Sequence, residues 1–255
     1  MILAIDMGNT NIVIGCIDHE KTYFVERLTT NRDKTGTEYA INIKNILEIH
    51  NILPSRIEGA ILSSVVPPLN APISSAVKKI LGYHPMLVGA GIKTGMNILM
   101  DNPKTVGSDM IVDAVAAIHD FPCPIIVIDM GTATTLSVVD RNGNYIGGVI
   151  LPGLRVSLDS LSSRTAQLPS ISIDIPKNVI GKNTIDCMRS GIMYGNAGMI
   201  DSIIDRMEAE LGETPSIVST GGLSRFIIPL CRHHIVYDNA LLLKGLLILY
   251  DKNHN

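Results

Sequence analysis

The chain has 255 residues, of which 46% are hydrophobic and only 4% aromatic, with no Trp and a formal net charge of −3. This length allows one large domain or two of about 120 residues each. Because aromatic residues are scarce, branched aliphatic side chains must fill the core, as in α/β proteins with buried strands. The small negative charge, without a basic stripe, argues against nucleic acid or an anionic membrane as a partner.

Targeting and redox signals point to a cytoplasmic protein. Asp6 interrupts the first apolar run, so the N-terminus does not resemble a signal peptide. The apolar stretch 240–250 is broken by Lys244 and Gly245 and is too short to span a bilayer. The four cysteines contain no CxxC pair, which favours reduced thiols. No membrane attachment is expected.

The first half of the chain is predicted to contain strands followed by alternating helix and strand. Strands are expected at 1–6, 11–18, 21–29, 59–65 and 86–88, and helices at 37–51 and from 67 to about 82. Thr35 or Thr37 would cap the first helix. A further helix over 105–121 connects the halves.

The second half repeats this plan. Strands are expected at 124–129, 134–140, 144–150 and 216–220, and helices at 154–165 and 184–211, after residue 222 and at the C-terminus. Asn142-Gly143 is a hairpin-turn signature. Residues 166–182 have no clear pattern and are expected to form an irregular loop. We expect an α/β fold with two domains, 1–115 and 116–255.

One short motif occurs twice. Asp6-Met7-Gly8-Asn9-Thr10 ends the first apolar run, and Asp129-Met130-Gly131-Thr132 ends the run at 124–128. An acid at the end of a buried strand is costly unless it is paired or near a cation. A glycine turn lets backbone N–H groups approach an anion. The repeat therefore favours two hairpins that hold phosphate and a metal over a plain polar turn, or over a second copy that has lost its ligand.

Three other polar stretches have competing interpretations. Asp109 lies near the start of a helix, where any acid suits the helix dipole, but between two phosphate hairpins it becomes a candidate general base. The segment 219–224 could contact adenosine or be a structural turn. Thr184 could cap its helix or reach a ligand. The adjacent pair His233-His234 is interpreted as a strand edge. No GxxxxGK[ST] motif occurs, so a kinase here would not use a P-loop.

Taken together, these motifs resemble those of the type III pantothenate kinases, in the superfamily of acetate and sugar kinases, heat-shock chaperones and actin. The matching segments are collinear and cover nearly the whole chain: Asp6-x-Gly8-Asn9-Thr10, Asn102-Pro103-x-x-Val106-Gly107-x-Asp109, Asp129-x-Gly131-Thr132-Ala133-Thr134, Gly147-Gly148 through Pro152-Gly153-Leu154, Thr165-Ala166-x-Leu168-Pro169, Gly181-x-Asn183-Thr184 and Gly221-Gly222. The resemblance implies two similar actin-like (ribonuclease H-like) halves, each a mixed sheet flanked by helices, with a nucleotide cleft between them.

The resemblance also implies an activity: transfer of the ATP γ-phosphoryl group to the primary hydroxyl of pantothenate, the first step of coenzyme A synthesis. Asp109 would accept the proton, and Asp129 would bind K⁺ or NH₄⁺. Asp6 would lie near the Mg²⁺ of ATP. The family is a cytoplasmic homodimer. The implied ATP contacts are Asp6, Met7, Gly8, Asn9, Thr10, Asn11, Ile12, Val13 and Thr132. The implied pantothenate contacts are Gly107, Ser108, Asp109, Met110 and Thr184.

Two departures from the family pattern lie in the substrate stretch. Met110 stands where Arg commonly follows the catalytic Asp, and Met100-Asp101 stand where an aromatic residue often precedes the Asn-Pro. Loss of a cation near a carboxylate-bearing substrate could weaken its binding by a few kcal/mol. The alternatives are therefore a paralogue that phosphorylates another small alcohol and a non-catalytic nucleotide-binding regulator.

Overall fold

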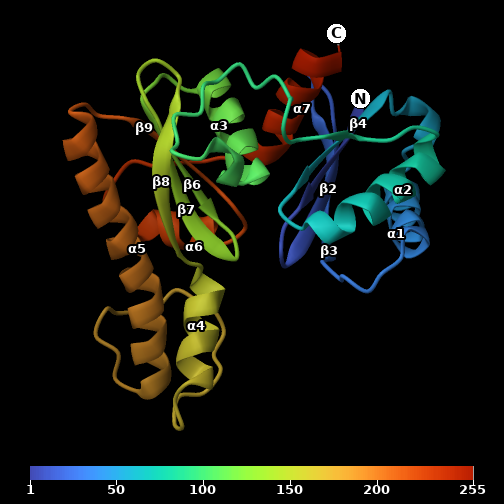
Figure 1. The fold of residues 1–255 in the computed structure, drawn as a ribbon. Helices are drawn as coiled ribbons and strands as arrows, with labels where there is room; N and C mark the ends of the chain where they lie inside the picture. The colour runs from blue at the N-terminus through green and yellow to red at the C-terminus, as the bar shows by residue number, and fades with distance from the viewer. Residues whose placement is uncertain (255) are drawn as a thin grey trace. The chain divides into compact units, whose positions relative to one another are not determined.

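The computed structural model describes residues 1–254, which form two compact units (Figure 1). Unit 1 comprises Met1–Gly95, Asp101–Ala116 and Ala240–Asn255, and unit 2 comprises Met96–Met100 and Ala117–Asn239. None of the helices in the described part of the chain is both long enough and apolar enough to cross a membrane.

Unit 1 is built on a five-stranded mixed sheet in the order β3-β2-β1-β4-β5. Its strands are β1 (Ile2–Met7), β2 (Asn11–Ile17), β3 (Thr22–Thr29), β4 (Gly59–Ser64) and β5 (Met86–Leu87). β1 to β3 are antiparallel, whereas β4 and β5 run parallel to β1. The helices are α1 (Gly36–Ile49), α2 (Asn70–Leu81), the start of α3 (Ser108–Asp120) and α7 (Leu241–His254).

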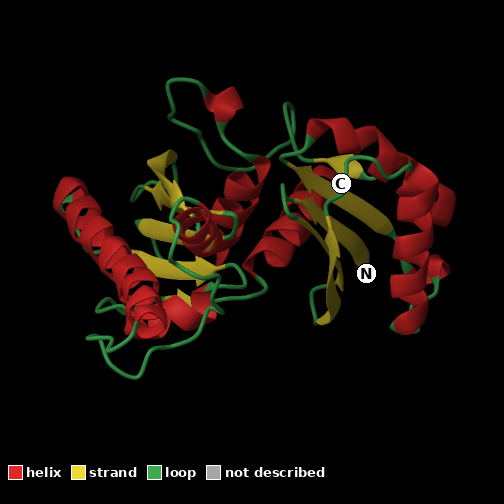
Figure 2. Cartoon of the chain, turned by 90° about the horizontal axis from the view of Figure 1, so that it is seen from below, coloured by secondary structure: helices red, strands yellow, loops and turns green. Residues whose placement is uncertain are grey.

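Side-chain alternation assigns the two faces of this sheet. Leu3, Ile5 and Met7 pack in one buried cluster with residues of α1 and α2, such as Ile43 and Ile73. The opposite face meets α7, which contacts β1, β2 and β4. Figure 2 shows helices on both sides of the sheet. The α1 helix begins as predicted, because Thr35 and Glu38 form a reciprocal capping box at its N-terminus.

The expected domain boundary at residue 116 would place the C-terminal helix α7 in the second domain. In the structure this helix belongs to unit 1. Glycines make its close packing possible. A Cβ atom on Gly15 would lie 2.7 Å from Leu243 Cδ1, and Gly245 backs onto Val112 of α3. Gly59 similarly leaves room for the Tyr250 ring. The buried residues of α7 therefore pack against the sheet of unit 1.

Unit 2 repeats the same topology, with the sheet order β10-β9-β6-β7-β8. Its strands are β6 (Ile125–Met130), β7 (Ala133–Val139), β8 (Tyr145–Pro152), β9 (Ser216–Thr220) and β10 (Val236–Tyr237), and its helices are α4 (Leu154–Ser163), α5 (Thr184–Leu211) and α6 (Ser224–Ile227). The antiparallel hairpin β6–β7 and the parallel neighbour β9 match β1–β2 and β4. Even the register shifts recur, at Cys16/Ile17 and Val138/Val139. The expected pair of similar halves is confirmed.

Most predicted elements are present, with three local differences. The helix expected from 105 starts at Ser108, because Pro103–Thr105 forms a separate 3-10 turn. The helix after residue 222 has only four residues before a second 3-10 turn at Ile228–Leu230. His233 and His234 precede β10 rather than lying at the edge of a strand. Residues 166–182 form the expected irregular loop.

Candidate active-site residues

The first Asp-Met-Gly motif lies at the carboxyl end of β1, in the turn to β2. Asp6 pairs in register with Val13 of β2 and Ser63 of β4, so these three side chains share one face of the sheet. The amide of Gly8 donates to the carbonyl of Asn11 at 3.0 Å, which closes the turn. This N–H is therefore committed to the hairpin itself.

The tip of this turn is exposed but anchored. Asn9, Thr10 and Asn11 are solvent-exposed, whereas Met7 and Ile12 are buried beneath them. Thr30 holds the turn from the side: its hydroxyl donates to the Gly8 carbonyl at 2.7 Å, and its amide donates to the Thr10 carbonyl at 2.9 Å. A polar loop fixed in this way keeps its shape without a ligand.

Ser108 connects the start of α3 to the end of β4. Its hydroxyl lies 3.0 Å from the Ser63 hydroxyl, accepts from the Ser64 amide at 3.0 Å and reaches the Ser64 carbonyl at 3.0 Å. Ser63 lies beside Asp6 on the neighbouring strand. These bonds therefore bring the N-terminus of α3 to the carboxyl ends of β1 and β4, where Asp6 lies. The predicted residues Asp6, Ser108 and Asp109 thus gather at one edge of unit 1.

Asp109 occupies the first turn of α3 and is partly buried. Its Oδ1 accepts the backbone N–H of Met110 at 2.8 Å. Burial raises the pKa of the Asp109 carboxyl above its ordinary value, and the backbone bond to Met110 offsets part of this rise. A carboxyl whose pKa is raised toward the working pH is suited to accepting a proton. A backbone bond of this kind does not depend on which side chain stands at position 110.

The second Asp-Met-Gly motif ends β6 in unit 2. Asp129 pairs in register with Thr135 of β7 and Thr220 of β9, so these hydroxyl residues lie on its face of the sheet. Thr134, a buried residue, projects to the opposite face. The threonines beside Asp129 are therefore Thr135 and Thr220.

Two glycines leave space around the Asp129 carboxylate. A Cβ atom on Gly221 would lie 2.7 Å from Oδ1, and Gly221 also has a φ of +92°, which disfavours other residues. A Cβ atom on Gly131 would lie 3.7 Å from Oδ2. The exposed Thr132 sits in the turn, where its carbonyl accepts from Gly153 at 3.1 Å.

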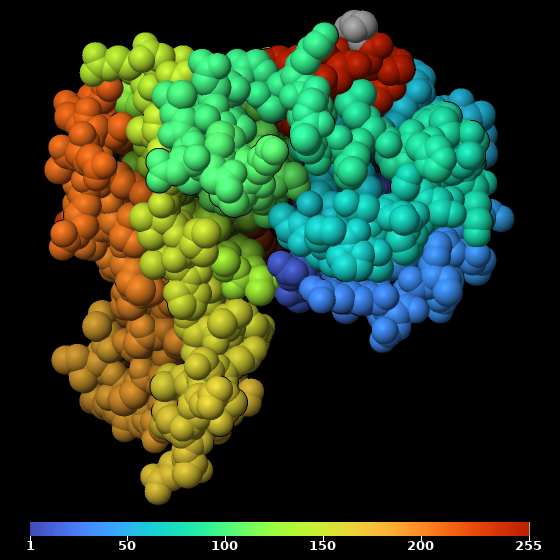
Figure 3. All heavy atoms as spheres, in the orientation of Figure 1, coloured from blue at the N-terminus to red at the C-terminus, as the bar shows by residue number. Residues whose placement is uncertain are grey.

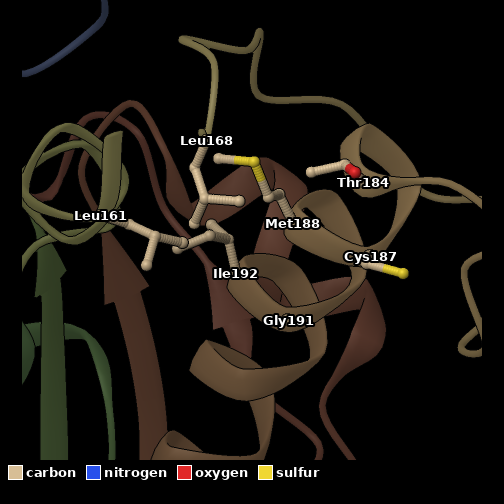
Figure 4. Close-up of a pocket in the computed structure, with 7 residues that line it drawn as sticks. All are labelled: Leu161, Leu168, Thr184, Cys187, Met188, Gly191 and Ile192. Carbon is tan, nitrogen blue, oxygen red and sulfur yellow. The ribbon is translucent and has the colours of Figure 1, made fainter. Parts of the chain in front are cut away.

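Thr184 lies elsewhere in unit 2, at the first position of α5. The preceding residue, Asn183, is the N-cap and accepts from the Asp186 amide at 2.9 Å. The Thr184 side chain is exposed at the rim of an apolar hollow of about 440 Å³ between α4, the 164–183 loop and α5 (Figure 4). The hollow is lined by Leu161, Leu168, Thr184, Cys187, Met188, Gly191 and Ile192.

The expected site residues thus fall into three groups. Asp6 to Val13 and Gly107 to Met110 share one edge of unit 1, while Asp129 and Thr132 share the corresponding edge of unit 2. Thr184 belongs to the α5 terminus. The sequence interpretation missed Ser63 and Ser64, whose positions as polar residues at the end of the apolar run 59–62 were the available signal.

Comparison with known proteins identifies the family. The family model described as "Type III pantothenate kinase" matches residues 2–206. A curated type III pantothenate kinase from Halalkalibacterium halodurans is 44% identical over 253 residues, which cover 99% of this chain and 100% of the relative.

Solved structures resemble the chain in fold. The activator of 2-hydroxyisocaproyl-CoA dehydratase from Clostridium difficile, with bound ADPNP, is 14% identical with a TM-score of 0.56, covering 99% of this chain and 94% of that one. An ROK hexokinase from Thermus thermophilus is 12% identical with a TM-score of 0.50, covering 98% of each chain. These likenesses support an actin-like fold. With the family model and the 44% identical relative, they place this chain in the type III pantothenate kinase family.

Proposed function

We propose that this chain transfers the γ-phosphoryl group of ATP to the primary hydroxyl of pantothenate, with Asp109 as the proton acceptor. The observation that carries the proposal is the position of Asp109. It lies partly buried at the start of α3, and Ser108 fixes this helix end beside the strands that carry Asp6 and Ser63. The match to the kinase family along most of the chain supports the same reaction.

The β1–β2 turn is the proposed phosphate site. Asp6 would bind Mg²⁺ carried by ATP, and the anchored turn 8–11 would present polar groups to the phosphates. Phosphoryl transfer depends mainly on positioning and on neutralising charge. The motifs contribute few lysines or arginines, so metal ions and backbone groups would offset most of the phosphate charge.

Asp129 is the proposed site for K⁺ or NH₄⁺, and Thr132 the proposed ATP contact beside it. The position of Asp129 at the carboxyl end of β6, with Thr135 and Thr220 on the same face of the sheet, supports this assignment. Oxygen ligands suit hard cations. A monovalent cation there would add positive charge that the side chains do not supply.

We assign the substrate to the stretch Gly107–Met110, with Thr184 contributing from α5. In this assignment Asp109 accepts the proton of the pantothenate hydroxyl as the new O–P bond forms, and ADP leaves. Met110 replaces the Arg common in the family, so the substrate carboxylate would need another donor. This substitution, together with Met100-Asp101 before Asn102-Pro103, favours a different small alcohol.

A homodimer is the proposed assembly, and we place its interface on the α4–α5 region. Figure 3 shows this region, yellow to brown, projecting from unit 2. Exposed apolar residues gather on it and on the loop between the helices: Val156, Leu161, Ile175, Val179, Ile180 and Ile185. Ile180 is 82% exposed, which is costly for an isolated chain. Light scattering should give twice the chain mass, and Ile180→Asp should lower it.

A coupled kinase assay tests the reaction directly. Purified protein should consume ATP only when pantothenate is present, and K⁺ or NH₄⁺ should raise the rate. A panel of similar small alcohols identifies the substrate if Met110 has changed it. Absence of pantothenate-dependent turnover with every monovalent cation would refute the proposed reaction.

A further inference from the structure

Three metal-ligating side chains gather in unit 2, outside the residues assigned to the kinase reaction. Asp205 and Glu208 lie one turn apart on α5, and His233 lies in the loop before β10. A carboxylate oxygen from each acid and a ring nitrogen of His233 all lie within 4.8 Å of one another. The site is therefore built between two elements that are distant in sequence.

A buried carboxylate fixes the loop against the helix. Asp201, only 3% exposed, accepts the backbone N–H of Arg232 at 2.9 Å and 3.0 Å, and that of His233 at 3.3 Å. These bonds hold the His233 backbone in place over the next turns of α5. Little rearrangement would be needed to bring its ring to a ligand, which lowers the cost of binding.

The imidazole of His233 faces acids on both sides. Its Nε2 is 2.8 Å from Asp205 Oδ1, and its Nδ1 is 3.9 Å from Glu208 Oε1. A neutral imidazole has one N–H and one lone pair. If Nε2–H donates to Asp205, the Nδ1 lone pair points toward a carboxylate, and either a proton on Nδ1 or a metal ion between the two groups relieves this repulsion.

Arg232 is the other partner of Asp205. Arg232 Nη2 bonds the other oxygen of Asp205 at 3.0 Å, but its side chain is 71% exposed and can move into solvent.

We propose that Asp205, Glu208 and His233 form a binding site for a first-row transition dication, for which Zn²⁺ is the probe. One imidazole with two carboxylates suits Zn²⁺ better than Mg²⁺ or Ca²⁺, which prefer oxygen ligands alone. The ion links the loop to α5, so its binding stabilises the folded unit.

Isothermal titration of the full chain with Zn²⁺, without nucleotide, tests the site. The wild type should bind one equivalent and show a rise in Tm with Zn²⁺. His233→Ala should weaken that binding by about tenfold or more, since even loss of a residue that supports a ligand costs roughly 10–100-fold. His234→Ala is the matched control, because this exposed neighbour is not part of the group.

Glu208→Gln provides a second variant that keeps the size of the side chain. It should weaken Zn²⁺ binding as His233→Ala does, with circular dichroism confirming the fold. Equal Zn²⁺ affinity in the wild type and in either folded variant would overturn the proposal, as would a wild type that binds no Zn²⁺. Pantothenate kinase activity is a separate readout, and its absence would leave this test unaffected.

Discussion

The two Asp-Met-Gly hairpins share a backbone but differ in what surrounds the acid. Asp6 and Asp129 have equivalent neighbours, an antiparallel strand on one side and a parallel strand on the other. At Asp6, the parallel strand ends in serines that bind the N-terminus of α3. At Asp129, it is followed by Gly221, where a Cβ atom would lie 2.7 Å from the carboxylate Oδ1.

This difference separates two roles that the repeated sequence does not distinguish. In unit 1 the neighbouring strand positions a second acid, Asp109, close to the edge that carries Asp6. In unit 2 the residue that follows the strand, Gly221, lies against the Asp129 carboxylate without a side chain of its own. A serine also ties a helix to the parallel strand in unit 2, where the Ser224 hydroxyl contacts the Ser219 hydroxyl at 2.9 Å and the Thr220 carbonyl. That helix brings no acid.

The largest expected effect is at Asp109. Asp109→Asn removes the proposed base while keeping the shape of the side chain, so kcat should fall by about 10²–10⁴-fold. Affinity for ATP, measured by titration calorimetry, should not change. Glu48→Gln, at an exposed acid on α1, is the control and should retain full turnover. Unchanged kcat in Asp109→Asn would remove its assigned role.

Substitution of Asp129 should impair a different property, the response to monovalent cations. Asp129→Asn should abolish the stimulation by K⁺ or NH₄⁺, because the cation loses its charged ligand; the expected cost is about 2–4 kcal/mol of transition-state stabilisation. Rates would be measured across a K⁺ titration at constant ionic strength. If the variant still responds to K⁺ as the wild type does, the two hairpins are not divided in this way.

A substitution at Gly221 tests whether its close approach to the Asp129 carboxylate affects stability. Gly221→Ala places a Cβ close to the carboxylate in a left-handed conformation, so the free energy of unfolding should fall by more than the ~1–2 kcal/mol that the conformation alone costs. Gly212→Ala is matched, since Gly212 has a φ of +71° with nothing within 4 Å. If Gly221→Ala and Gly212→Ala lower Tm equally, the close approach of Gly221 to Asp129 contributes nothing to the loss of stability.

Ser108 tests the connection to Asp109. Ser108→Ala removes the bonds to Ser63 and Ser64 and leaves polar groups unpaired, which should cost about 1–3 kcal/mol of stability. The pH profile of kcat should shift as well, because the environment of Asp109 changes. Ser202→Ala, exposed on α5, should alter neither Tm nor the profile. A normal profile in Ser108→Ala would limit Ser108 to a structural role.

The smallest expected effect is on how the stability of the folded chain depends on pH. The folded chain holds the Asp109 proton to higher pH than the unfolded chain, in which its pKa is near 3.8. Stability therefore falls as the pH rises from that value through the raised folded pKa. Asp109→Asn lacks this loss, so its Tm should exceed that of the wild type at neutral pH, and the excess should vanish below pH 3.8. An excess that does not change with pH would have another cause.

Much of this molecule could be predicted from local sequence. Periodicity and caps located α5 and β9 at their observed bounds, and the repeated motif predicted two similar halves. These signals work because strand alternation and helix capping depend on neighbouring residues. The short α6 and the late start of α3 were missed, since prolines and packing end or delay a helix in ways that composition does not fix.

The sequence alone determined the fold class, the order of the elements and the acids at the strand ends, because each is written in residues close together along the chain. Only the tertiary structure decided which of them meet. Ser63 pairs with Asp6 and binds Ser108, and Gly221 lies against Asp129. The helix α7 packs on the first sheet at Gly15 and on α3 at Gly245. Contacts of this kind join residues far apart in sequence, and they form only when strand register and glycine-lined packing bring the elements together.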